Sequence, residues 1–424
     1  MKILFATFIL IAFTSFLCGE ELLLQNDFDK AVEFAKKYYP IPTGTNTWII
    51  IDDKDQTIRT SLPFQFVFTT IRINRQIACE APYCFLGERN GMWFLLIDES
   101  TEKKIEIPEG LNIKFILPNA YIVFSVEKRI FDGLFRPSTK SFPIGINQIF
   151  SYRDGIIAGN TAVFSTKKPN DGKDYSKHQV VLVDTNYKEI LREPAVINNR
   201  IVRYNPIGEG IIHRESVPLV INGNFIKAKE YKSTLYNLDM EKIMDFPDGW
   251  SLHLPFNNGA AVFVSKIDKV GDPFKYMFVH KTGKIIFETD KDIISGQNGI
   301  FRFRDLKTFL EGYIDQFGKI ILPAKYEQTT NFINGKAFVT EREKIVSDGD
   351  ETTLKCYEID ILGNKLREIK VGFDILPLLH RGFGISVNRR KPGLYKLDGT
   401  LIWTTDNKKI INRCFNFYQQ FTSE

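Results

Sequence analysis

The chain has 424 residues, of which 43% are hydrophobic and 25% charged, the proportions of a folded globular protein. This length exceeds that of an ordinary single domain, so it predicts either several domains or an array of repeats. The formal net charge of +5 is small for the length, and the one visible basic run, Asn388–Lys391, is too short to indicate nucleic-acid binding.

The first 19 residues are typical of an export signal. Lys2 precedes an apolar segment, Ile3–Leu17, which is too short for a stable membrane span. We therefore predict a cleaved signal peptide at residues 1–19, and a periplasmic, outer-membrane-surface or extracellular location. Two alternative N-termini are possible for the mature chain. Cys18 is a candidate for lipidation, as in bacterial lipoproteins, although Leu17 replaces the usual small residue; cleavage after Gly19 is the alternative.

Residues 20–46 are predicted to contain a helix and a linker. Asn26 or Asp27 can cap a helix that extends to Tyr39, and its apolar residues follow the spacing of one buried face. Pro40 ends this helix, and the following residues up to Gly44 are expected to form the linker. We expect the helix to pack on the end of the β-structure, with partner binding as the alternative.

Residues 47–424 are predicted to form a β-repeat domain. An apolar string, an Asp, a polar turn and a second apolar string recur at intervals of 34 to 55 residues. The Asp or its equivalent falls at Asp52, Asp98, Asp132, Asp184, Asp239, His280, Asp315, Asp360 and Asp398. We expect each of these side chains to accept a hydrogen bond within its own turn. Such spacing is typical of units too small to bury their apolar face alone.

A second motif, a Gly that opens a short alternating strand, precedes most copies of the first. It occurs at Gly159, Gly210, Gly259, Gly299, Gly335 and Gly382. Within the copies of the first motif, Gly318 follows Asp315 by three residues, and Gly283 follows His280 by the same interval. We predict that both close hairpin turns with φ > 0.

The best-defined unit resembles the WG-repeat (KWG) proteins of bacteria. Residues 312–340 contain Gly-Tyr-Ile-Asp, then Gly-Lys-Ile-Ile and a Pro, and later Gly-x-Ala-x-Val; residues 257–287 are similar. Gly312-Tyr313 replaces the Trp-Gly pair of that family, and units before residue 155 match weakly. The resemblance implies repeated β-hairpins and export, but no activity and no functional residues.

The predicted fold is all-β: a β-propeller-like ring of about seven to eight repeat blades with a short N-terminal helix. The tail from Ile411 to Phe417 alternates like a strand and is expected to complete the first blade. A β-solenoid is the alternative, although solenoids usually keep a stricter period.

The sequence contains no HExxH, GxSxG, GxxxxGK[ST] or GxGxxG motif, and its five histidines fall in five different units. We therefore predict no catalytic, cofactor-binding or metal-binding residues. Cys79 and Cys84 are close enough in sequence to clip a loop with a disulfide, with buried thiols as the alternative. Cys356 and Cys414 are the other cysteines of the mature chain.

These features predict a non-catalytic exported scaffold. We expect a monomer that binds a protein, peptide or glycan through loops on one face, and that contacts a membrane only through an N-terminal lipid anchor if Cys18 is acylated. The alternative is a propeller-type glycan-processing enzyme. Such an enzyme needs carboxylates from different units within about 5 to 10 Å of one another at the mouth of the channel.

Overall fold

The computed structural model describes the polypeptide from residue 26 to residue 419 with gaps. The described residues are 26–27, 29–35, 37–42, 48–52, 84–89, 92–108, 111–117, 120–125, 132–135, 148–153, 156–160, 178–184, 186–218, 230–265, 274–344, 352–370, 382–386 and 391–419. Within them the chain is almost entirely β-structure, with one helix at each end. No helix in this part of the protein is both long and apolar enough to cross a bilayer.

The described strands form nine antiparallel sheets, and in each sheet the strands follow chain order. The two-stranded sheet contains β1 (Tyr39–Pro42) and β2 (Trp48–Ile51). The three-stranded sheets contain β3 (Leu86–Arg89), β4 (Met92–Leu96) and β5 (Glu102–Ile105); β6 (Leu111–Leu117), β7 (Ala120–Ser125) and β8 (Asp132–Phe135); and β30 (Phe383–Ser386), β31 (Gly393–Lys396) and β32 (Leu401–Thr404).

The larger sheets lie in the middle of the chain. The four-stranded sheets contain β9 (Gln148–Arg153), β10 (Ile156–Asn160), β11 (Gln179–Asp184) and β12 (Glu189–Pro194); β18 (Trp250–Asn257), β19 (Ala260–Ser265), β20 (Tyr276–His280) and β21 (Ile285–Thr289); β22 (Asp292–Gln297), β23 (Ile300–Arg304), β24 (Glu311–Asp315) and β25 (Ile320–Tyr326); and β26 (Gln328–Thr329), β27 (Lys336–Lys344), β28 (Thr352–Asp360) and β29 (Lys365–Ile369). The five-stranded sheet contains β13 (Val196–Ile197), β14 (Arg200–Pro206), β15 (Ile212–Pro218), β16 (Lys232–Tyr236) and β17 (Lys242–Asp245).

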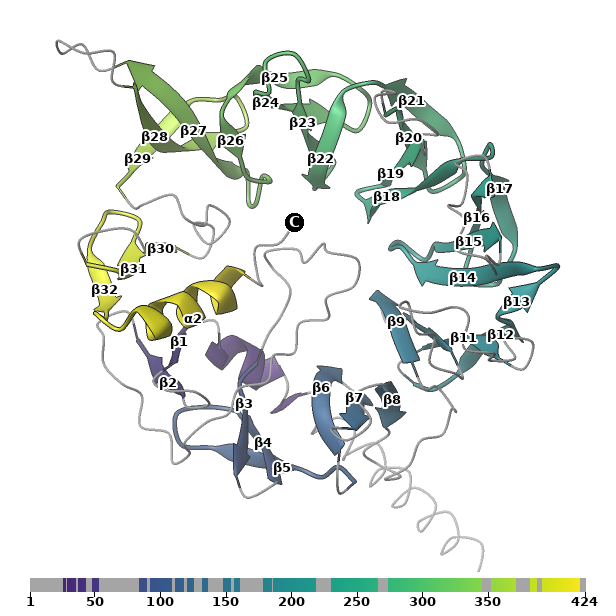
Figure 1. Ribbon diagram of the computed structural model, residues 1–424, viewed down its shortest axis with the longest axis horizontal. Helices are drawn as coiled ribbons and strands as arrows, with labels where there is room; N and C mark the ends of the chain where they lie inside the picture. Colours follow the sequence, from purple (N-terminus) through teal and green to yellow (C-terminus); the bar gives the residue numbers. More distant parts are fainter. Residues whose placement is uncertain are drawn as a thin grey trace, which may run out of the picture.

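The sheets stand side by side around a ring (Figure 1). In the four-stranded sheets the first strand lies nearest the centre and the last lies at the outside. This arrangement confirms the predicted all-β propeller with about seven to eight blades and a short N-terminal helix.

Two kinds of tight turn lie at the same end of each regular sheet. The first and second strands are joined by Asn-Gly pairs in which both residues have positive φ, at Asn258-Gly259, Asn298-Gly299 and Asn334-Gly335. These values define type I′ turns, whose twist matches that of the flanking strands. In these three copies the Gly of the second sequence motif is the last turn residue. The prediction was wrong at Gly159, which lies inside β10 and pairs with both neighbouring strands. The third and fourth strands are joined by a five-residue turn described next, and in a meander the first and third connections lie at the same end.

Each five-residue turn has a residue with positive φ three positions after its first residue. In the turn Asp315–Lys319 this residue is Gly318, with φ 90°, and Asp315 Oδ1 accepts hydrogen bonds from the backbone N–H groups of Phe317 and Lys319. Gly283 has φ 84°, so the predicted backbone of both turns is confirmed. We call the end of the ring that carries these two kinds of turn the turn face, and the opposite end the loop face.

The positions of three repeats differ from the prediction. Asn237, not Asp239, occupies the first position of its turn, because Met240 has φ 61° and the N–H groups of Asp239 and Glu241 both bond to Asn237 Oδ1. In the last sheet the first position is Lys396, because Gly399, with φ 89°, donates to the Lys396 carbonyl. The third difference is at Asp132, which begins strand β8 and does not precede a turn.

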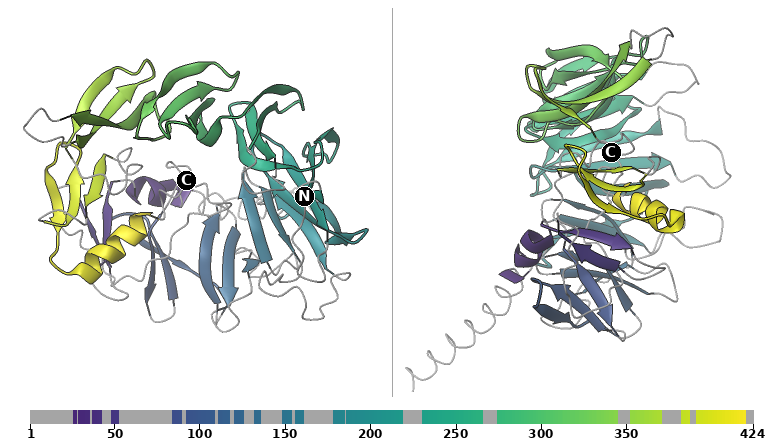
Figure 2. Two further views of the ribbon diagram at one scale, coloured as in Figure 1. Left: turned by 45° about the horizontal axis from the view of Figure 1, so that its top comes forward. Right: turned by 90° about the vertical axis from the view of Figure 1, so that its left-hand side faces the viewer.

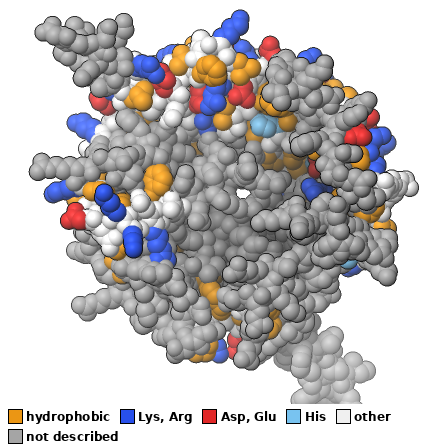
Figure 3. All heavy atoms as spheres, in the orientation of Figure 1, with side chains coloured by type: hydrophobic (Ala, Val, Ile, Leu, Met, Phe, Trp, Pro, Cys, Tyr) orange, Lys and Arg blue, Asp and Glu red, His pale blue; other side chains and the backbone are white. Residues whose placement is uncertain are grey.

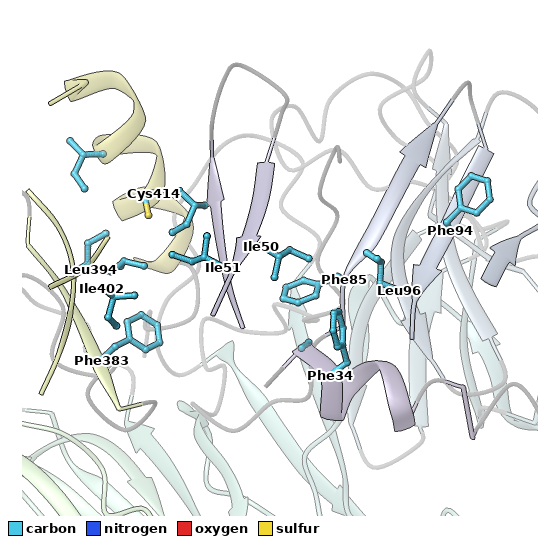
Figure 4. Packing of buried hydrophobic residues seen from close by; sticks show 14 residues of the cluster. Phe34, Ile50, Ile51, Phe85, Phe94, Leu96, Phe383, Leu394, Ile402 and Cys414 are labelled. Atoms are coloured by element: carbon cyan, nitrogen blue, oxygen red, sulfur yellow. The ribbon is translucent and has the colours of Figure 1, made fainter. Parts of the chain in front are cut away.

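The two ends of the chain meet where the ring closes. A buried cluster joins Phe34 and Ile50 from the N-terminal part to Phe383, Leu394 and other residues of the C-terminal part (Figure 4). No described strand of the last sheet pairs with a described strand of the N-terminal part. Among these residues, hydrophobic packing therefore joins the ends of the ring.

Helix α2 (Lys408–Gln419) takes part in this closure and corrects one prediction. Residues 411–417 were expected to form a strand, yet they are helical, and Ile411 and Cys414 face the cluster at helical spacing. The alternating pattern was misleading because the helix buries only one narrow side. Residues 39–42 also differ from expectation: they form β1, which pairs with β2, where a linker was predicted.

The N-terminal helix, residues 26–27 and 29–35, packs on the β-structure as expected. Ala31 and Val32 contact the core of the sheet β3–β5, and Phe34 and Ala35 contact the closure cluster. Strand β32 runs away from its preceding turn, so α2, which follows it closely, lies on the loop face. Figure 2 (right) shows the N-terminal helix on the opposite side of the ring from α2, which is the turn face.

Candidate functional site

Two of the three candidate site residues predicted from the sequence fall outside the described residues. Cys18 and Cys79 lie outside the described residues, so lipidation and the Cys79–Cys84 disulfide stay predictions. Cys84 is buried against Leu86 and Trp93. Cys356 is also buried, and burial raises the pKa of its thiol to about 12, which makes it a poor nucleophile.

Two acids beside the inner strands, Glu209 and Asp292, are engaged with other groups. Glu209 accepts a hydrogen bond from the Gly259 N–H at 2.6 Å and lies 3.7 Å from Lys281. Asp292 accepts a 2.8 Å hydrogen bond from the Tyr276 hydroxyl. Within the described ranges no group of three His, Cys, Asp or Glu side chains could hold a metal ion.

A buried polar network joins the sheet β22–β25 to its neighbour β26–β29. The Arg302 guanidinium, 8% exposed, donates to Glu311 Oε2 at 3.2 Å, Thr329 Oγ1 at 2.9 Å and Ser295 Oγ at 3.1 Å. Glu311 Oε2 also accepts from the Thr329 N–H and hydroxyl. Because each charge is paired and hydrogen-bonded, the network fixes the geometry between the two sheets.

One loop on the loop face is joined to this network through Glu311, which begins the strand that follows the loop. Residues 305–310 connect β23 to β24, and the pair at its base, Arg304 and Glu311, is joined by a 2.9 Å ion pair. Asp305 Oδ1 accepts hydrogen bonds from the N–H groups of Lys307 and Thr308 and from the Thr308 hydroxyl. Those from Thr308 and Lys307 lower the pKa of Asp305, so the carboxylate stays ionised and holds the loop at neutral pH.

The loop presents two apolar side chains to solvent. Phe309 is 68% exposed and has φ 60°, and Leu306 is 52% exposed. A bulky residue with positive φ is an outlier that costs of order 1–3 kcal/mol. The backbone bonds from Phe309 N to the Asp305 carbonyl (2.7 Å) and from Asp305 N to the Leu310 carbonyl (2.9 Å) hold this conformation. The loop is therefore a rigid support for an exposed aromatic ring.

Two neighbouring connections add apolar side chains to the loop face. Phe274 is 45% exposed before β20, and Leu354 is 46% exposed near the start of β28. Figure 3 views this face and shows hydrophobic side chains over the sheet β22–β25, with charged groups of both signs around them. No motif in the sequence pointed to residues 305–310. An Asp followed three residues later by Thr indicates such a turn, but exposure of the following Phe depends on the fold.

One part of the chain is similar to a known repeat family. A model described as "WG containing repeat" matches residues 312–344, which cover the third and fourth strands of one sheet and the start of the next. No curated protein matches the chain.

Similar solved structures are distant. A protein of unknown function from Bacteroides caccae is 12% identical, with 55% of this chain and 90% of that chain covered and a TM-score of 0.23. PorZ, a surface component of the type-IX secretion system of Porphyromonas gingivalis, is 10% identical, with 87% and 52% covered and a TM-score of 0.25. Oligopeptidase B from Leishmania major is 9% identical, with 91% and 57% covered and a TM-score of 0.34. The chain spans about half the length of the last two proteins.

Proposed function

We propose that this protein is an exported, non-catalytic propeller scaffold that binds a protein or peptide segment through its loop face. The observation that carries the proposal is Phe309, an aromatic side chain 68% exposed on a strained backbone that a fully bonded loop holds in place. Exposed aromatic anchors on rigid supports are typical of residues that dominate binding energy.

The support of the loop favours binding over a purely structural role. Asp305 and the ion pair between Arg304 and Glu311 hold both ends of the loop, yet Phe309 itself points into solvent, where it adds nothing to the core. No core contact offsets the backbone strain at Phe309, which is consistent with selection of this residue for binding a partner. An apolar or aromatic peptide side chain is the complementary group, because Leu306 lies on the same loop and Phe274 and Leu354 are also exposed on this face.

A selection from a random-peptide library against the exported protein tests the proposal. We expect enriched peptides to contain aromatic or aliphatic residues, and Phe309→Asn to weaken their binding at least tenfold. Asn tolerates positive φ, so this variant should be more stable than the wild type by about 1 kcal/mol, and lost binding cannot be attributed to unfolding.

Phe317→Asn is the matched control, because Phe317 is also 68% exposed but lies on the turn face. Equal loss of binding in both variants, or peptides that bind Phe309→Asn as well as the wild type, would contradict the proposal. A glycan array completes the test: glycan binding that survives Phe309→Asn would point to a different site and ligand class.

A further inference from the structure

The turn face carries most of the exposed apolar residues of the described part of the chain. The described residues include thirteen exposed large hydrophobic side chains. Eight of them belong to the five-residue turns or to the start of the outer strand that follows: Leu238, Ile285, Phe317, Ile320, Ile361, Leu362, Leu366 and Leu401. Phe317 and Leu362 are 68% and 76% exposed and occupy the same position in two successive turns. Exposed apolar side chains at a repeated position indicate an interaction surface for a protein or a membrane.

Six of these residues lie on the turns and outer strands of three successive sheets, and we call them the rim patch: Ile285, Phe317, Ile320, Ile361, Leu362 and Leu366. A Cβ added at Gly318 would lie 3.1 Å from the Phe287 ring, so the Phe317 turn lies against the strand that begins at Ile285. A Cβ added at Gly363 would lie 2.8 Å from a Leu322 methyl group, so the Leu362 turn lies against the strand that begins at Ile320. The patch therefore extends over three neighbouring sheets.

Lysines accompany the apolar tips. A lysine follows the first turn residue by four or five positions in five successive turns, at Lys188, Lys242, Lys284, Lys319 and Lys365. Lys284, the last residue of the preceding turn, and Lys319, the last residue of the Phe317 turn, are exposed. Lys242 is paired with Asp245 at 2.8 Å and Lys365 with Glu341 at 2.6 Å. Asp315 and Asp360 accept hydrogen bonds from their own turns. Apolar tips with lysines behind them match the depth profile of a bilayer interface, where ammonium groups reach the phosphates and apolar groups enter the acyl region.

The position of the N-terminal helix also favours a membrane as the binding partner of the turn face. The N-terminal helix lies on the turn face (Figure 2). Only eight residue steps separate Cys18 from the first described residue, Asn26, a reach of about 28 Å at most. An acyl chain on Cys18 would therefore hold this face close to a membrane. A flat bilayer can touch all turn tips of one face together, because they end the sheets of a ring on the same side.

We propose that the rim patch docks the turn face onto a lipid bilayer, so that the loop face points away from the membrane. Docking by the patch does not require lipidation, because insertion of Phe317, Leu362 and their apolar neighbours supplies a second, independent membrane signal. The lysines add attraction to anionic lipids, which salt weakens.

Vesicle flotation tests the proposal on the exported protein carrying Cys18→Ala, which no acyl chain can anchor. The probes are vesicles of phosphatidylcholine alone and of phosphatidylcholine with phosphatidylglycerol. We expect flotation with both, and stronger flotation with the anionic vesicles at low salt. The pair Phe317→Ser and Leu362→Ser should lower the partition coefficient at least tenfold, whereas Phe309→Ser, a matched change on the loop face, should leave it unchanged.

Tryptophan fluorescence gives a second readout, in which the exposed apolar side chain is replaced by another apolar one. Phe317→Trp in the same background should shift its emission to shorter wavelength when vesicles are added, whereas Phe309→Trp should not shift. The proposal is overturned if the protein does not float, or if the paired serine variant floats as well as its parent. It is also overturned if sedimentation shows a dimer that the serine pair dissociates, because the patch would then bind a second copy. Peptide binding at Phe309 is measured separately, so failure here leaves the proposed function standing.

Discussion

Gly318→Ala and Gly335→Ala form a matched pair that separates backbone strain from contact between sheets. Both glycines have positive φ, 90° and 75°, and both lie in turns of the turn face. A Cβ at Gly318 would lie 3.1 to 3.3 Å from three atoms of the Phe287 ring, whereas a Cβ at Gly335 would have no neighbour within 4 Å. Only the first substitution therefore presses one sheet against the next.

The magnitudes follow from these two terms. A left-handed conformation costs a non-glycine residue about 1–2 kcal/mol, which applies to both variants. Overpacking costs about 1–3 kcal/mol more and applies only to Gly318→Ala, because Phe287 is itself stacked on Phe278 at 4.2 Å and has little room to move. We expect Gly335→Ala to lower stability by about 1–2 kcal/mol and Gly318→Ala by about 2–5 kcal/mol, from the sum of these terms.

Chemical denaturation followed by circular dichroism measures the difference between the two variants. A double-mutant cycle with Phe287→Ala isolates the contact: removing the ring should recover most of the extra cost of Gly318→Ala and none of the cost of Gly335→Ala. Equal costs for the two glycines, or no coupling to Phe287, would refute the packing of each turn on the preceding sheet.

Three further predictions concern pH, ring closure and export. Burial lowers the pKa of His213 to about 3 from an ordinary value near 6.5, so its contribution to stability is complete above pH 6.5 and is lost as the pH falls towards 3. At pH 4.5 the loss should reach about 2–3 kcal/mol, and denaturation of His213→Gln at pH 7.5 and 4.5 should show a correspondingly smaller pH dependence; an unchanged dependence would show that His213 does not cause it. Leu394→Ala should raise hydrogen exchange in both terminal helices, since the buried cluster joins them, whereas Phe338→Ala, in another cluster, should spare the N-terminal helix; exchange confined to one end in Leu394→Ala would contradict packing as the closure. Mass spectrometry of the exported protein should find an acylated Cys18 or an unmodified start near Glu20, and an intact Met1 would rule out both.

The repeat pattern was visible in sequence because each hairpin is specified locally. Asn298-Gly299 and Asn334-Gly335 supply the two positive φ values of a type I′ turn, and Gly318 supplies the one required by the next turn. Where another residue takes that position, the local signal weakens. Met240 has φ 61° without being glycine, so the nearby Asp239 was mistaken for the turn residue that Asn237 provides.

The candidate binding residues could not be found in this way. Phe309 and Phe317 are both phenylalanines in polar surroundings, and no sequence pattern distinguishes an exposed ring from the buried Phe301 or Phe303. Their exposure follows from the positions of two loops at opposite ends of one sheet. Such positions exist only after the sheets have assembled into a ring.

The sequence by itself therefore determined the strands, the hairpin turns and the repeated unit, because these depend on neighbouring residues and on the conformational freedom of Gly and Asn. Only the tertiary structure decided how the ring closes, because closure depends on contacts between residues more than 300 positions apart, such as Tyr39 and Phe383, whose rings pack edge to face. The same contacts decided the conformation of residues 411–417. Their apolar residues fit either a strand or a helix locally, and burial of Ile411 and Cys414 in the closure cluster selects the helix.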